Sequence, residues 1–131
     1  MIIEFIGLAE KVEEGYSIFF PDFPGLGSAG DDLEDARKNA KEALVAHIEL
    51  MTEDRESIPK PSSLDHVMQL SEAKGCIPLI IAIILPSGKS QRINITMDGA
   101  LLEAIDAAAT HQHKTRSALL AEAAYKLLSE L

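Results

Sequence analysis

The chain has 131 residues, and its 12 basic and 21 acidic side chains give a formal net charge of -9. A length of this order suits one domain or two small ones, and a composition of 47% hydrophobic and 25% charged residues is typical of a globular protein. The longest apolar run, residues 77–85, is far shorter than the roughly 20 residues that span a bilayer, and the first residues carry no basic leader. One cysteine, Cys76, excludes an internal disulfide and a four-thiolate zinc site. We therefore expect a cytoplasmic protein.

The charge is distributed unevenly along the chain. Residues 1–88 hold 7 basic and 16 acidic side chains, whereas residues 89–131 hold 5 of each. An acidic first part repels nucleic acid and attracts basic partners. The neutral second part can form a local positive face from its basic side chains Lys89, Arg92, Lys114 and Arg116. The sequence thus predicts two parts with different partners.

The first part reads as a small α+β domain. Residues 2–11 and 16–20 flank a Glu-Glu-Gly turn and predict a β-hairpin, which Pro21 and Pro24 bring to an end. Asp31 or Asp32 can cap a helix that runs to about residue 54 with one apolar stripe. A short helical turn is expected within residues 64–71. Residues 77–85 give the strongest strand signal and suggest a strand that is buried on both faces.

The second part predicts one strand followed by two helices. Residues 90–97 alternate strictly, and helices are expected from Asp98 to about residue 109 and from Thr115 to the C-terminus. One strand and two short helices are too few to form a core alone, and a lone strand leaves its backbone groups unpaired. Two chains would solve both problems by pairing their strands into an antiparallel ribbon. Such a ribbon fits the major groove of DNA.

The outward face of that ribbon carries the predicted base-reading residues Arg92, Asn94 and Thr96, because guanidinium and amide groups make paired hydrogen bonds to purine edges. A solvated polar strand face is the alternative. Residues at the start of the last helix are predicted to hold DNA phosphates through backbone amides and positive charge. They are Lys114, Thr115, Arg116 and Ser117. Helix capping explains Thr115 equally well.

At this point two known families can be identified by resemblance. Residues 92–97, 101–109 and 115–124 resemble the ribbon-helix-helix DNA-binding fold, and residues 16–25, 30–36 and 42–44 resemble the N-terminal domain of HicB-type antitoxins. The resemblance implies an α+β protein with a degraded RNase H-like sheet and one covering helix in residues 1–86. It implies a ribbon-helix-helix (β-α-α) dimerisation domain in residues 87–131.

The resemblance also implies a function. It predicts an antitoxin that binds and neutralises a small basic HicA-type toxin, which cleaves mRNA, and that represses its own operon by binding operator DNA as a dimer or tetramer. The predicted toxin-binding residues are Asp22, Phe23, Pro24, Gly25, Asp31 and Asp32. The loop between the last two helices lacks the glycine usual for the family. We therefore expect a non-glycine residue at positive φ there, which histidine tolerates better than β-branched residues.

Two other classes of function stay open. A stand-alone ribbon-helix-helix repressor would use its first domain to sense a small ligand or a metal. A nuclease would need several carboxylates around two metal ions, and Asp22 at a strand end lacks such companions in the sequence. The pair His111 and His113 has a metal-binding spacing but no placed carboxylate or thiolate beside it. We therefore expect no enzymatic activity, no metal site and no cofactor.

Overall fold

The computed structural model describes residues 1–130. The chain divides into two compact units, Met1–Ser87 and Gly88–Leu131. The sequence predicts the boundary one residue earlier, between residues 86 and 87. Among the described residues, no helix is both long enough and apolar enough to cross a bilayer.

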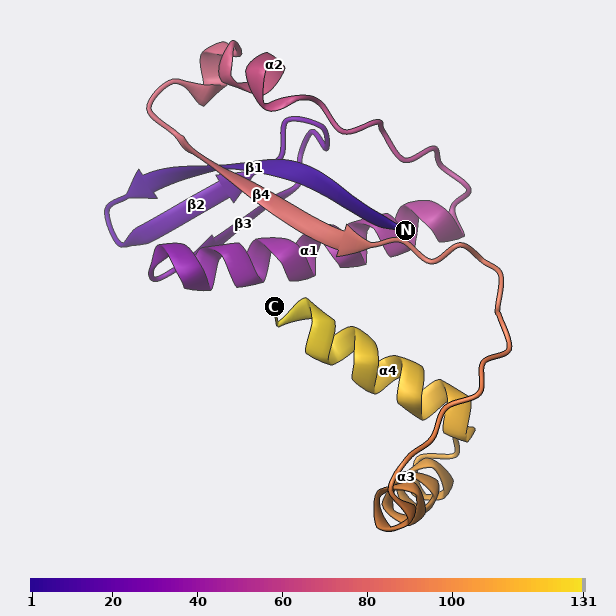
Figure 1. Ribbon diagram of the computed structural model, residues 1–131. Coiled ribbons are helices and arrows are strands. Elements are labelled where there is room, and N and C mark those ends of the chain that lie inside the picture. The colour runs from indigo at the N-terminus through magenta and orange to yellow at the C-terminus, as the bar shows by residue number, and fades with distance from the viewer. Residues whose placement is uncertain (131) are drawn as a thin grey trace. The chain divides into compact units, whose positions relative to one another are not determined.

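The first unit is built on one antiparallel sheet (Figure 1). Its strands are β1 (Ile2–Val12), β2 (Gly15–Phe19), β3 (Gly27–Gly30) and β4 (Ile77–Ile84), arranged in the order β3-β2-β1-β4. The predicted hairpin is confirmed by β1 and β2, which pair from Leu8↔Phe19 to Val12↔Gly15. The sequence did not predict β3, because Gly-Ser-Ala-Gly has neither the β-branched nor the aromatic residues that mark a strand.

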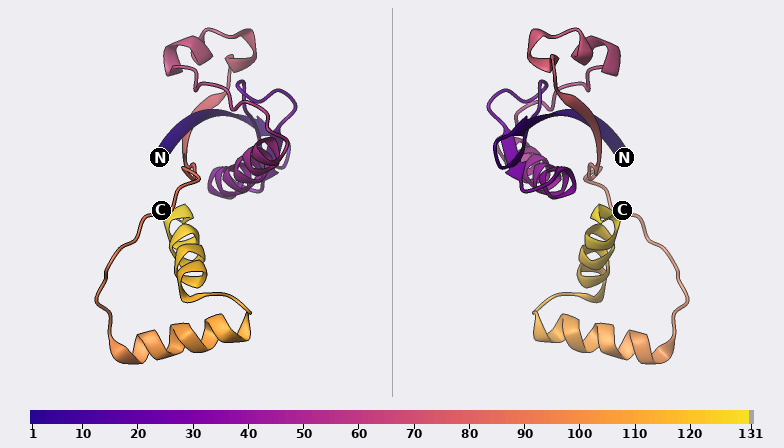
Figure 2. Two further views of the ribbon diagram at one scale, coloured as in Figure 1. Left: turned by 90° about the vertical axis from the view of Figure 1, so that its right-hand side faces the viewer. Right: turned by 90° about the vertical axis from the view of Figure 1, so that its left-hand side faces the viewer.

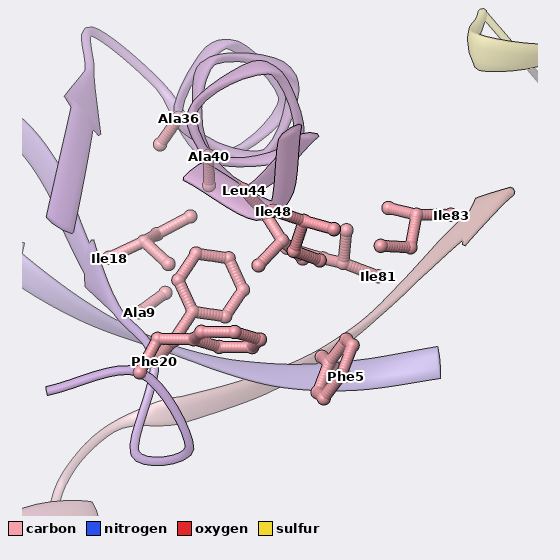
Figure 3. Packing of buried hydrophobic residues seen from close by; sticks show 11 residues of the cluster. Phe5, Ala9, Ile18, Phe20, Ala36, Ala40, Leu44, Ile48, Ile81 and Ile83 are labelled. Carbon is pink, nitrogen blue, oxygen red and sulfur yellow. The ribbon is translucent and has the colours of Figure 1, made fainter. Parts of the chain in front are cut away.

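One face of the sheet is covered by α1 (Leu33–Glu53), as Figures 1 and 2 show. The helix begins at Asp32, whose side chain accepts a hydrogen bond from the Asp35 amide, so the predicted cap is confirmed. Gly30 permits the close approach of β3 to α1, because a Cβ at Gly30 would lie 2.2 Å from the Ala36 nitrogen. The apolar side chains between helix and sheet form the main core (Figure 3). It includes Phe5, Ala9, Ile18, Phe20, Ala40, Leu44, Ile48 and Ile81.

The other face of the sheet is covered only in part. The short helix α2 (Leu64–Met68) and the 3₁₀ turn η1 (Ser71–Ala73) lie above it, opposite α1 (Figure 1). Their buried residues Val67 and Ala73 pack with Ile6 and Leu8 of β1. The helical turn predicted within residues 64–71 is thereby confirmed. The prediction that β4 is buried on both faces is wrong, because Ile80 on its far face stays 48% exposed.

The second unit contains α3 (Gly99–His111) and α4 (Arg116–Ser129), which begin after the caps Asp98 and Thr115. The turn that ends α3 has His113 at φ 56°, so the expected non-glycine residue at positive φ is confirmed. Two backbone hydrogen bonds close this turn, from the Lys114 amide to the Ala109 carbonyl at 2.8 Å and from the His113 amide to the Thr110 carbonyl at 3.2 Å. This pattern is the Schellman motif, which satisfies carbonyls that a helix end leaves unpaired.

The strand predicted for residues 90–97 is not formed in the single chain, where residues 89–98 have no regular secondary structure. A strand requires a hydrogen-bonded neighbour, and the unit offers none because its remaining elements are helices. The alternating side chains Ile93 and Ile95 are 71% and 60% exposed. The ribbon therefore stays a prediction for an assembly of two chains.

Candidate functional site

The loop that connects β2 to β3 contains four of the predicted toxin-binding residues, and it is held in place by the core. Phe23 is 3% exposed, and its ring lies edge-on to Phe5 at 4.8 Å and to His47 at 5.7 Å between centroids. Its amide donates to the Phe20 carbonyl at 3.0 Å. Phe23 is thus an anchor for the loop and presents almost no surface to a partner. Pro24 and Gly25, next along the chain, are exposed.

Asp22 in the same loop is engaged within the unit. Its carboxylate accepts hydrogen bonds from the Ser62 amide at 2.9 Å and from the Ser62 hydroxyl at 2.6 Å. Both contacts are partly buried, and they attach the β2–β3 loop to the extended segment before α2. Hydrogen bonds to a carboxylate are among the stronger ones in proteins. The geometry therefore explains Asp22 as a structural link across 40 residues of chain.

Asp31 and Asp32, the other predicted toxin-binding residues, lie at the exposed start of α1. The Asp32 side chain accepts from the Asp35 amide at 2.7 Å, and the Asp35 side chain accepts from the Asp31 amide at 3.0 Å. This reciprocal arrangement satisfies amides that a helix start leaves without partners. It also concentrates negative charge at an accessible corner of the unit.

The predicted base-reading residues lie on the extended segment that precedes α3. Arg92, Asn94 and Thr96 are all exposed, as are the intervening Ile93 and Ile95. A face that separates polar from apolar side chains arises only when this segment adopts a strand conformation. The structure of the single chain thus leaves these residues accessible and does not test which base edges they would read.

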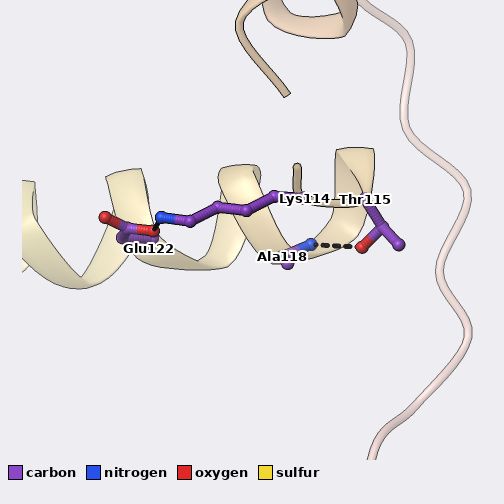
Figure 4. A network of polar contacts seen from close by, with 4 residues as sticks. All are labelled: Lys114, Thr115, Ala118 and Glu122. Atoms are coloured by element: carbon purple, nitrogen blue, oxygen red, sulfur yellow. Dashed lines mark hydrogen bonds and ion pairs between the residues drawn. The ribbon is translucent and has the colours of Figure 1, made fainter. Parts of the chain in front are cut away.

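Two of the predicted phosphate-binding residues at the start of α4, Lys114 and Thr115, have partners within the unit (Figure 4). The Thr115 hydroxyl accepts from the Ala118 amide at 3.1 Å, which makes it the helix cap. Lys114 forms an ion pair with Glu122. A phosphate that binds here would compete with a carboxylate for Lys114. Ser117 is exposed on the first turn of the helix.

Arg116 forms a two-pronged contact with Asp106 of α3, with its Nε and one terminal nitrogen each 2.8 Å from a carboxylate oxygen. The hydrogen bond from Arg116 lowers the pKa of Asp106 below its ordinary value. Such paired contacts fix orientation, so Arg116 joins α3 to α4. Sequence reasoning missed this role because a helix-to-helix pair ten residues apart has no local signature. It missed Ser62 for the same reason.

The helices of the second unit leave much apolar surface exposed. Only Ala109 of the two helices is buried, whereas Leu101 is 51% and Leu127 63% exposed. Exposed apolar patches of this kind mark interaction surfaces. Within residues 88–130, the large apolar side chains that are exposed in the single chain are Ile93, Ile95, Leu101, Tyr125, Leu127 and Leu128.

Among residues 1–130, no group of three His, Cys, Asp or Glu side chains is close enough to hold a metal ion. The Cys76 thiol packs beside the smaller cluster of Ile6 and Leu8, and burial raises its pKa, with a further contribution from Glu10. A thiol with a raised pKa is a poor nucleophile at neutral pH.

Comparison with known proteins identifies related chains of similar length. A protein described as an uncharacterized 14.9 kDa protein in the rep-hol intergenic region of Haemophilus phage HP1 is 43% identical over 125 residues, which are 92% of this chain and 94% of that protein. Antitoxin HicB of Escherichia coli K12 is 30% identical over 90 residues, which are 66% of this chain and 65% of that protein.

Solved structures are similar to this chain, over nearly its whole length in one case and over 60% of it in another. The antitoxin HicB of Burkholderia pseudomallei matches with a TM-score of 0.61 and 32% identity, covering 96% of this chain and 98% of that one. A structure described as a HicA3 and HicB3 toxin-antitoxin complex matches with a TM-score of 0.54 and 28% identity, over 60% of this chain and 95% of the matched chain. The family described as HicB-like antitoxin of bacterial toxin-antitoxin systems matches residues 5–124, so this chain belongs to the HicB-like antitoxin family.

Proposed function

We propose that this antitoxin binds and neutralises a small basic HicA-type toxin that cleaves mRNA, and that its first unit is the part that holds the toxin. The observation that carries the proposal is the family match together with the acidic charge of residues 1–88. The matched HicA3 and HicB3 complex supports a toxin as the partner, and its matched chain aligns with 60% of this one. Opposite charge speeds and orients such an association.

Of the predicted toxin-binding residues, Pro24, Gly25, Asp31 and Asp32 remain candidates because they are exposed. Phe23 and Asp22 support the loop that presents them. The sheet itself is proposed to be a degraded RNase H-like sheet, since its three-stranded antiparallel start is followed by a covering helix. We propose that this sheet binds the toxin and does not catalyse a reaction.

The second unit is proposed to pair with a copy of itself and to bind operator DNA, so that the antitoxin represses its own operon from the cytoplasm. Pairing of residues 90–97 from two chains would cover Ile93 and Ile95, which are exposed in the single chain. It would also place Arg92, Asn94 and Thr96 twice on one surface. The apolar helix surface of the unit supports such pairing, because burial of that surface stabilises the association.

Coexpression tests the toxin proposal. A small basic reading frame found next to this gene would be expressed from an inducible promoter, with and without this chain, while cell growth and mRNA integrity are measured. We expect growth arrest and mRNA cleavage from that reading frame alone, and recovery of both when this chain is present. Lack of protection, or a neighbour that is harmless when expressed alone, would contradict the proposal.

A further inference from the structure

The sheet of the first unit has a second face that α1 does not contact, and part of it is accessible. The pairing of β1 with β4 runs without a bulge from Ile2↔Ile84 to Ala9↔Ile77, so opposite residues lie on the same face. Glu4 and Ile6 therefore share the face opposite α1 with their partners Ala82 and Ile80. The end of this face beyond α2 and η1 is called here the open face, and it consists of Ile2, Glu4, Ile80, Ala82 and Ile84.

The open face is more apolar than an ordinary surface of a small acidic unit. Ile2 is 72% and Ile80 48% exposed, and Ala82 and Ile84 are half-buried around them. The cluster beneath α2 and η1 protects Ile6, which is 7% exposed, but it does not extend to Ile80. Glu4 lies between these aliphatic side chains, so the open face combines an apolar surface with a single negative charge.

The edges of the sheet are poorly suited to a partner strand. Met1 and Leu85 exchange backbone hydrogen bonds at 3.1 and 2.8 Å. Because the residues of a strand point their backbone groups alternately toward and away from the neighbouring strand, the amide and carbonyl of Ile80 point away from β1. The Arg37 guanidinium donates to that outward carbonyl at 2.8 Å, and Pro78, two residues earlier, has no amide hydrogen. At the opposite edge the Asn39 side chain donates to the Ala29 carbonyl at 2.9 Å. A partner therefore gains more by packing on the face than by extending the sheet.

Charge selects the class of partner. On the strand positions of the face opposite α1, the only charged side chains are Glu4 and Glu10, and both are exposed. The unit as a whole carries the -9 of residues 1–88, so a second copy of the same unit or an anionic surface would be repelled. A protein with basic side chains around an apolar patch is complementary to this face.

We propose that the open face is the docking surface for the basic toxin, with Ile80 as an apolar contact beside the covered Ile6 and Glu4 pairing with a lysine or arginine of the toxin. This inference rests on the proposed function, since it names the place where that partner binds. The aliphatic side chains supply affinity when they are covered, and Glu4 supplies orientation and part of the association rate.

Matched charge reversals in the full chain test the location. Glu4→Lys changes the open face, Asp31→Lys changes the rival candidate site at the start of α1, and the control Glu49→Lys changes the outer side of α1. All three replace an exposed carboxylate with the same change in net charge. Toxin affinity is measured by calorimetry at low and at high salt. We expect Glu4→Lys to weaken binding about tenfold or more at low salt and the other two variants to weaken it several times less.

A second pair of variants tests the apolar contact at Ile80. Ile80→Arg introduces charge at a residue that is 48% exposed, and Leu50→Arg does so on α1 at a residue that is 59% exposed. We expect loss of toxin binding for Ile80→Arg and wild-type affinity for Leu50→Arg. Ile80→Thr keeps the β-branched shape favoured in strands and should weaken binding about tenfold with an unchanged fold, as verified by thermal melting.

The outcomes separate the inference from the function on which it rests. If wild-type protein binds the toxin and the open-face variants bind equally well, or if Asp31→Lys or Leu50→Arg causes the larger loss, the docking surface lies elsewhere and the inference is overturned. If the wild-type protein itself does not bind the toxin, the proposed function fails first. Selective loss on Glu4→Lys and Ile80→Thr supports the inference.

Discussion

The two units of the chain differ in how they treat their apolar side chains. Residues 1–87 enclose a core between α1 and the sheet, where Phe5, Leu44 and Ile18 are fully buried. In residues 88–131 the single buried apolar side chain among those described is Ala109, while Ile93 and Leu127 are mostly exposed. We therefore expect the first unit to fold alone and the second unit to need a further apolar surface.

The largest effect is expected when the chain is divided after residue 87. The fragment 1–87 should melt cooperatively at a temperature that does not depend on its concentration. The fragment 88–131 should melt at a temperature that rises with concentration, because association stabilises the folded form by mass action, by about 1.4 kcal/mol for each tenfold change. Circular dichroism at several concentrations measures both. A concentration-independent transition for 88–131 would show that this unit folds without a partner.

Substitutions of apolar residues test the same difference between the two units. Leu44→Ala should destabilise the first unit by about 2 to 5 kcal/mol, because it opens a cavity at a residue that is 0% exposed. Leu50→Ala, at an exposed position of the same helix, should change stability by less than about 0.5 kcal/mol. Leu101 in α3 is 51% exposed in the single chain, so Leu101→Ala should cost more than Leu50→Ala only when a second chain covers α3. A cost for Leu101→Ala as small as that for Leu50→Ala, measured by urea unfolding, would mean that no second chain covers α3.

The sequence predicted best those elements that carry local signals. The hairpin, α1 with its Asp32 cap, and the two C-terminal helices carry local signals, namely alternation, helical spacing and capping residues, and each was predicted correctly. The short strand β3 was missed, because pairing with β2 and contact with α1 form it in spite of its weak propensity. Residues 90–97 have a clear alternation but form no strand in one chain.

The candidate sites were harder to predict, because each depends on contacts between distant residues. Phe23 was predicted from the resemblance to contact a partner, yet its ring packs with Phe5. Asp22 is held by Ser62, and Arg116 by Asp106, in pairs that no motif joins. A sequence pattern indicates which residue types are present, and only the fold decides which of them remain accessible.

Operator binding should respond to the second unit alone. Arg92→Ala and Asn94→Ala should each weaken specific operator binding by about 1 to 3 kcal/mol, because each removes paired hydrogen bonds to a base edge. Gln91→Ala, which alternation places on the opposite face, is the control and should bind normally. Fluorescence anisotropy with labelled operator measures affinity, and toxin binding is expected to be unchanged in all three variants. Normal operator affinity in both substituted proteins would refute the base-reading assignment.

The link between Asp22 and Ser62 should matter for stability and not for toxin contact. Removing either partner leaves a partly buried polar group without its hydrogen bond, so Asp22→Ala and Ser62→Ala should each cost about 1 to 2 kcal/mol. The double variant should cost less than the sum of the two. Chemical unfolding of all four proteins completes the cycle. Additive costs, or a loss of toxin affinity from Asp22→Ala alone, would contradict this structural role and leave Asp22 a candidate for toxin contact.

The smallest expected effect lies at two helix ends that share one geometry. Arg55 after α1 and His113 after α3 have φ values of 59° and 56°, and each ends its helix with the same pair of backbone hydrogen bonds. A left-handed conformation costs a side-chain-bearing residue about 1 to 2 kcal/mol, and glycine avoids that cost while losing about 0.5 to 1 kcal/mol through its freer unfolded chain. Arg55→Gly and His113→Gly should therefore each stabilise by about 0.5 kcal/mol.

The two glycine variants also test whether the units are independent. Arg55→Gly should raise the melting temperature of residues 1–87 at every concentration, and His113→Gly should shift only the concentration-dependent transition. The controls Ala46→Gly and Ala107→Gly place glycine inside α1 and α3, where it should destabilise by about 1 kcal/mol. Because each variant and its control lie in one helix, opposite signs within a pair isolate the backbone conformation as the cause. A shift of the first unit's transition by His113→Gly would show that the two units unfold together and that their separation into self-sufficient and partner-dependent parts is wrong.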